Sequence, residues 1–162
     1  MQQCQWLWVS LVNTRRMEHT NTNIRYRIGG FDMTQFVPSW DGLEGCENFE
    51  IRSGVDFAYN FEQNVIKSIL NIEFSHKEKT ALIIQLCTFV SISEDTVAAL
   101  EKDGKIVIPA DFLAQCASFG HGALRGIMYL KTKNTPLEGI ILPPVVYSKM
   151  FKKPISFDKN LE

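Results

Sequence analysis

The pattern of apolar and polar positions is strongest from Ala81 to Ser93, where the chain reads ALIIQLCTFVSIS. Neither glycine nor proline interrupts this segment, and many of its residues are β-branched, which is typical of a strand. Successive side chains on a strand point to opposite faces, so both faces of this strand carry mainly apolar side chains. The chain is able to cover one face with a helix of its own. We therefore expect the other face to contact another chain or a ligand.

Three shorter alternating segments predict further strands, at residues 23–34, 48–59 and 65–74. In the first of them, Gly29 and Gly30 are expected to end a half-buried edge strand. The polar residues 75–79 predict a turn into the long strand, so these two strands should pair antiparallel. Residues 35–46 contain one proline and two glycines and predict a loop.

The polarity pattern becomes helical after Ser93. Residues 94–102 predict a short helix, and residues 106–109 an apolar hinge. Residues 110–131 carry apolar side chains at steps of three and four, which predicts a long amphipathic helix. A final short helix is expected after Pro143-Pro144, because proline is tolerated in a first helical turn. The predicted fold class is α+β, an antiparallel four-stranded sheet with the long helix and the short final helix packed on one face.

The expected domain organisation is simple. Residues 1–22 form an N-terminal extension that need not be ordered, residues 23–152 form a single α+β domain, and residues 153–162 form a polar tail. Arg15 and Arg16 follow the first apolar stretch, whereas a secretory signal has its positive charges before that stretch. We therefore expect no signal peptide and a cytoplasmic protein.

Composition excludes several classes of partner. A formal net charge of −1 argues against a broad basic surface for nucleic acid. No apolar run reaches the length of about 18 residues that a membrane-spanning helix needs, so membrane insertion is not expected. The four cysteines have no spacing typical of a zinc site or a compact disulfide framework. Free thiols in a reducing compartment are the simpler interpretation, with no metal and no cofactor.

Residues for catalysis are not arranged in any recognisable motif. The chain lacks GxxxxGK[ST], GxGxxG, HExxH and GxSxG. His121 is flanked by glycines, and we interpret it as a partly exposed helix residue. Cys87 and Cys116 are interpreted as small buried apolar groups. The chain is therefore not expected to be an enzyme.

From Val55 to Phe151 the chain combines several features in a fixed order. These are the long strand with Phe89 before Ser91-Ile92, the Ile108-Pro109 entry to the long helix, and the ending PPVVYSKMF. The pattern LRG-I-x-x-x-K-T occupies residues 124–132. Together these features resemble the export chaperone SecB and its SecB-like relatives, and the last pattern is closer to the SecB-like branch.

The resemblance implies an ATP-independent chaperone that holds unfolded polypeptides or preproteins in apolar grooves and assembles as a homo-oligomer, a dimer or a tetramer. The implied client-binding residues are Phe36, Trp40, Phe57, Tyr59, Phe74 and Phe89. The implied subunit-interface residues are Ile84, Leu86, Thr88, Phe119 and Leu124.

The family uses acidic residues on the sheet to dock on the translocation ATPase, but one of these positions falls near Gln85, which is neutral. This departure puts docking on that ATPase in doubt. Two alternatives stay open at this point. One is a dedicated binder of a single partner, such as an antitoxin or one secreted protein. The other is a small-molecule binder or enzyme that uses a cavity on the sheet.

Overall fold

A computed structural model describes residues 7–9, 23–46 and 48–160. Four long strands form an antiparallel sheet in the order β3-β4-β5-β2, and the three-residue β1 pairs with β3 at the far edge. The bounds of these strands are Leu7–Val9 (β1), Tyr26–Pro38 (β2), Glu50–Asn60 (β3), Val65–His76 (β4) and Lys79–Ile92 (β5). Among the described strands, β2 therefore forms the edge of the sheet beside β5.

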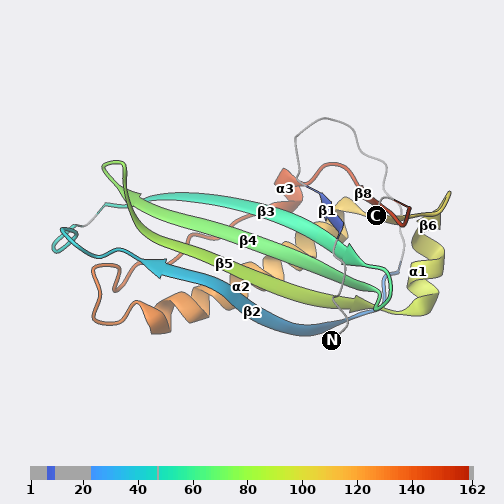
Figure 1. The fold of residues 1–162 in the computed structure, drawn as a ribbon, viewed down its shortest axis with the longest axis horizontal. Helices are drawn as coiled ribbons and strands as arrows, with labels where there is room; N and C mark the ends of the chain where they lie inside the picture. Colours follow the sequence, from blue (N-terminus) through green and yellow to red (C-terminus); the bar gives the residue numbers. More distant parts are fainter. Residues whose placement is uncertain (1–6, 10–22, 47, 161–162) are drawn as a thin grey trace.

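Three helices and a small second sheet complete the described fold. The helices are α1 (Glu94–Leu100), α2 (Ala110–Lys131) and α3 (Tyr147–Met150), and the small antiparallel sheet consists of β6 (Glu101–Lys102), β7 (Lys105–Ile108) and β8 (Ile155–Asp158). The long helix α2 lies along one face of the main sheet (Figure 1). This arrangement confirms the predicted α+β class and the long helix at residues 110–131.

The core lies between α2 and the sheet. Alternate residues of β5, from Leu82 to Val90, face α2 and are almost fully buried. One core cluster lies toward β7, β8 and α3, and a second lies toward the C-terminal end of α2. Burial of such aliphatic side chains contributes roughly 1.5–3 kcal/mol each.

Three expectations drawn from the sequence are wrong. The edge strand does not end at residues 29–30, because a register shift between Ile28 and Gly30 lets β2 continue to Pro38. Residues 35–38 of the expected loop at 35–46 are therefore strand, and residues 39–46 remain outside any strand or helix. Residues 106–108 of the expected hinge belong to strand β7, which pairs with β8, and Pro109 is the N-cap of α2.

The expected polar tail also needs correction. Residues 155–158 form β8, and Ile155 and Phe157 are buried in the core at 4% and 0% exposure. The domain thus includes part of the segment expected to lie outside it. The expected N-terminal extension, residues 1–22, lies outside the described residues apart from Leu7–Val9, which forms β1.

Candidate functional site

Half of the predicted client-binding side chains lie in the core of the chain itself. Phe57, Tyr59 and Phe74 are each 0–1% exposed. The ring of Phe151 covers Phe57 at a centroid distance of 5.4 Å, and the ring of Phe157 stacks on Tyr59 at 5.6 Å. As the chain is folded here, these three side chains have no surface left for a client, which corrects their predicted role.

The other three predicted client-binding residues are partly exposed, but they do not form one groove. Phe36 and Trp40 both pack against the core cluster at the C-terminal end of α2, and Lys131 lies 5.0 Å from the ring centroid of Phe36. Phe89 points to the opposite face of the sheet, where the Lys67 ammonium lies 5.9 Å from its ring centroid. Only Phe36 and Trp40 therefore belong to one surface.

The predicted subunit interface also needs correction. The side chains of Ile84, Leu86, Thr88 and Leu124 are all 0% exposed, because they fill the space between the sheet and α2. They have no area left to contact a second subunit. Phe119 differs from them: it is partly exposed, and its ring lies 5.7 Å from that of Tyr26 on the edge strand.

A row of apolar side chains on β2 was missed by the sequence interpretation. Tyr26, Ile28 and Phe31 lie on the α2 side of this edge strand and are 38–45% exposed. Tyr26 also packs against the ring of Phe112 at 5.3 Å, and its hydroxyl accepts a hydrogen bond from Gln115. The alternation at residues 24–28 was visible in the sequence, but the apparent stop at the glycines hid its continuation to Phe31.

The face of the sheet away from α2 is crossed by a ladder of polar side chains. Thr34 donates to the side-chain oxygen of Gln85 (2.6 Å), the Gln85 amide donates to Asn71 (2.8 Å), and the Asn71 amide donates to Asp56 (3.2 Å). These four residues lie on β2, β5, β4 and β3 respectively. The second face of the long strand is therefore polar at its centre, which corrects the expectation that both of its faces require an apolar partner.

His121 is buried rather than partly exposed, at 7% exposure. Its Nε2 lies 2.9 Å from the carbonyl oxygen of Pro143, and its Nδ1 lies 3.2 Å from the Tyr147 hydroxyl. A carbonyl oxygen only accepts, so Nε2 carries a proton and donates to Pro143, and Nδ1 shares its hydrogen bond with the Tyr147 hydroxyl. With both nitrogens engaged, this histidine ties α2 to the segment before α3.

The described residues offer little reactive chemistry. Burial raises the pKa of the Cys116 thiol to about 12, so it is protonated at neutral pH and a poor nucleophile. Within the described ranges, no three His, Cys, Asp or Glu residues cluster as ligands for one metal ion. Among the same residues, no helix combines the length and apolar character needed to cross a membrane.

Comparison with known proteins leaves the chain without an assigned family. No protein-family model matches it, and no curated protein matches it significantly. The surface features of the chain that bear on function are the exposed apolar row on β2 and the partly exposed Phe36 and Trp40.

Proposed function

We propose that this chain is a SecB-like, ATP-independent chaperone that holds unfolded polypeptides or preproteins, without catalysis of its own. The observation that carries the proposal is the apolar side of the edge strand β2, which has an exposed row at Tyr26, Ile28 and Phe31 for a second copy and the partly exposed Phe36 farther along for a client. Contiguous exposed apolar residues on a monomer mark surfaces for other polypeptides. An edge strand adds unpaired backbone N–H and C=O groups, which bind an extended chain whatever its sequence.

The client surface in this proposal lies around Phe36 and Trp40. Phe36 ends the apolar side of β2, Trp40 follows on the loop after the strand, and both pack against the same core cluster. Val37, between them in sequence, pairs with Ile83 and therefore points to the opposite face of the sheet. Apolar burial at roughly 25 cal/mol per Å² gives affinity without selecting one sequence, which suits a protein that holds many clients.

Self-association is the second part of the proposal, and the charges on β2 favour a second copy as the partner. When two β2 strands pair antiparallel about a two-fold axis at residues 29–30, Arg27 of each copy lies opposite Asp32 of the other. Both side chains are on the face away from α2, since they pair with Ser91 and Cys87 of β5. Such a pairing is isologous and joins the two sheets across the dimer.

The same register also matches the apolar row. Ile28 of one copy lies opposite Phe31 of the other, and both side chains are on the α2 side. Directly opposed residues of an antiparallel pair contact each other, and apolar and opposite-charge pairs both stabilise the pairing. The proposed homo-oligomer thus covers Ile28 and Phe31 and leaves Phe36 and Trp40, farther along β2, for clients.

Light scattering of a chemically denatured client, diluted with and without this protein, tests the holding activity. We expect the wild-type protein to suppress aggregation at near-stoichiometric ratios, and the double substitution Phe36→Ser with Trp40→Ser to weaken this suppression several-fold. The matched control is Met150→Ser, which removes an apolar side chain that is 48% exposed on α3. Absence of suppression by the wild-type protein contradicts the proposal.

A further inference from the structure

Strand β8 is held in the manner in which a chaperone would hold an extended client. Its backbone pairs antiparallel with β7, from Ile108 opposite Ile155 to Lys105 opposite Asp158. Its side chains alternate, with Ile155 and Phe157 buried and Ser156 exposed. An added strand gains affinity from main-chain hydrogen bonds and specificity from pockets for alternate side chains. Residues 155–158 show both features.

The pocket that receives Phe157 contains aromatic side chains of the main sheet. The ring of Phe157 is stacked on Tyr59, at an interplanar angle of 30°, and Tyr59 in turn meets Phe61 edge-on at 4.9 Å. Tyr59 is one of the residues that the sequence predicts for client binding, and it is buried in a cluster that includes Ile155 and Phe157. The side chain that covers this predicted client-binding residue thus comes from the chain's own strand β8.

We propose that β8 is an intramolecular strap over a second polypeptide site, and that the ligand of this site is an extended peptide with two apolar side chains separated by one polar residue. The occupant seen in the structure, Ile155-Ser156-Phe157, defines this chemistry. The inference rests on the proposed holding function and adds regulation to it. Displacement of β8 opens a pocket lined by Tyr59 and the edge of β7.

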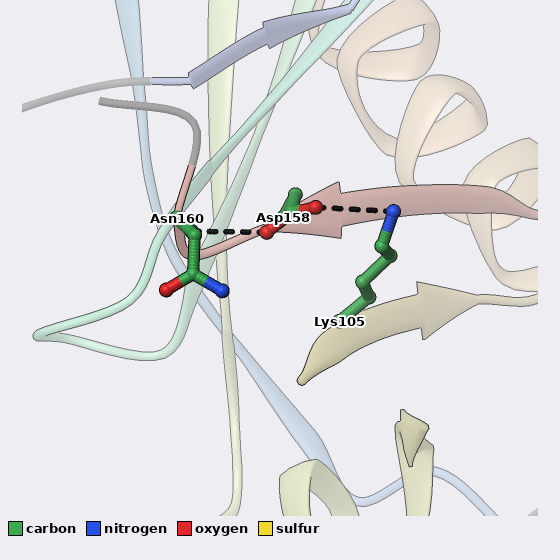
Figure 2. A network of polar contacts seen from close by, with 3 residues as sticks. All are labelled: Lys105, Asp158 and Asn160. Atoms are coloured by element: carbon green, nitrogen blue, oxygen red, sulfur yellow. Dashed lines mark hydrogen bonds and ion pairs between the residues drawn. The ribbon is translucent and has the colours of Figure 1, made fainter. Parts of the chain in front are cut away.

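The ion pair that fastens β8 at its far end is accessible to solvent on one side, with the Lys105 side chain 48% exposed and the Asp158 side chain 18% exposed. Lys105 forms an ion pair with Asp158 at 3.0 Å, and the Asn160 backbone N–H donates to Asp158 at 2.9 Å (Figure 2). The Asn160 hydrogen bond, followed by Lys105, holds the pKa of Asp158 below its usual value. At the near end, residues 152–154 are exposed. Solvent-accessible ion pairs contribute little and are screened by salt, so the Lys105–Asp158 pair holds the far end of β8 only weakly.

A disulfide lock tests the proposal in the full chain. Val107 and Ser156 are direct partners across β7 and β8, and neither is buried. The substitutions Val107→Cys and Ser156→Cys place two thiols near the separation that a disulfide requires. The probe is a fluorescently labelled peptide with the sequence of residues 153–160, followed by anisotropy. We expect oxidation to weaken peptide binding at least tenfold and reduction to restore it.

The matched control lock joins Arg52 and Glu73, direct partners on β3 and β4, through Arg52→Cys and Glu73→Cys. Oxidation of this pair leaves β8 free, so peptide binding should not change.

A second variant weakens the attachment of β8 instead of locking it. Phe157→Ser removes the side chain that seats the strap and should strengthen peptide binding at least tenfold, whereas Ser156→Ala on the same strand should leave it unchanged. If the Phe157→Ser variant does not fold, the disulfide lock between β7 and β8 still tests whether β8 blocks peptide binding.

The outcomes separate this inference from the proposed function. Equal peptide binding by the oxidised and reduced forms of the β7–β8 lock overturns the strap, even when both forms suppress client aggregation. Redox-dependent peptide binding supports the strap, even when neither form suppresses client aggregation. That second result contradicts only the holding function.

Discussion

A Cβ atom placed on Gly120 would lie 2.6 Å from Oγ1 of Thr88, closer than real Cβ atoms come to other atoms. Gly120 faces the middle of the sheet from α2, and Thr88 is the fully buried β5 residue beneath it. Thr88 pairs across the sheet with Ser68, and neither hydroxyl has a hydrogen-bond partner among the described residues. The helix thus lies close to the sheet at a position where the residues on both sides are small.

This contact predicts that Gly120→Ala destabilises the protein, although alanine is the better helix former. Overpacking of a buried contact costs about 1–3 kcal/mol, which outweighs a gain in helix propensity of about 1 kcal/mol. Chemical denaturation measures the difference. Gly122→Ala is the control, since nothing lies within 4 Å of its added methyl group, and it should stabilise slightly. Equal effects of the two substitutions contradict the contact.

Self-association through β2 predicts a charge-dependent dimer. Arg27→Asp should weaken the dimer about tenfold or more, because it places two carboxylates opposite each other across the proposed two-fold axis. Asp32→Arg should do the same with two guanidinium groups. The double exchange of both residues should restore association, as measured by sedimentation at micromolar concentration. A protein that is monomeric at these concentrations, or a double exchange without recovery, contradicts the proposed register.

Burial of His121 predicts a cost when its hydrogen bonds are removed. His121→Phe leaves the Pro143 carbonyl and the Tyr147 hydroxyl without their present partner, at about 1–3 kcal/mol in the free energy of unfolding. His121→Gln retains a donor and an acceptor and should lose less. His76→Gln, near the surface, should change stability by less than about 0.5 kcal/mol. Urea titrations of the three variants rank these effects, and a neutral His121→Phe would contradict the buried link.

Alkaline pH should destabilise the fold through two tyrosines. Burial raises the pKa of Tyr59 and of Tyr147 to about 12, from an ordinary value of 10.0. The folded-state pKa exceeds the unfolded value, so the stabilising contribution is fully present below pH 10.0 and is lost as the pH rises toward about 12. Each tyrosine accounts for up to about 2 kcal/mol. Denaturation at a series of pH values measures this loss, and Tyr59→Phe should make it shallower.

The sequence predicted correctly the elements whose pattern of apolar residues lies within one continuous segment. The helix at 110–131 matched because its apolar steps of three and four, and its limits, are all local. The long strand matched for the same reason, with observed bounds of Lys79–Ile92. The edge strand was cut short because Gly29 and Gly30 usually end a strand, whereas here they are absorbed by a register shift.

Features that depend on distant partners were not predictable in the same way. Residues 105–108 and 155–158 are too short to show a period, and their pairing joins segments about fifty residues apart in the chain. Of the candidate site, the aromatic character of Phe57 and Tyr59 was visible, but not their burial. The rings that cover them, Phe151 and Phe157, belong to segments that the sequence predicts as the end of a helix and a polar tail.

The polar ladder from Asp56 to Thr34 makes the molecule two-sided. An apolar chain lying across that face would have to separate amides that already satisfy one another, and it would offer them nothing in return. Under the proposed holding function, clients are therefore expected at the edge and the helix side of the chain rather than across the ladder. On the same proposal, we expect a long client to run along one flank of the sheet rather than to encircle it.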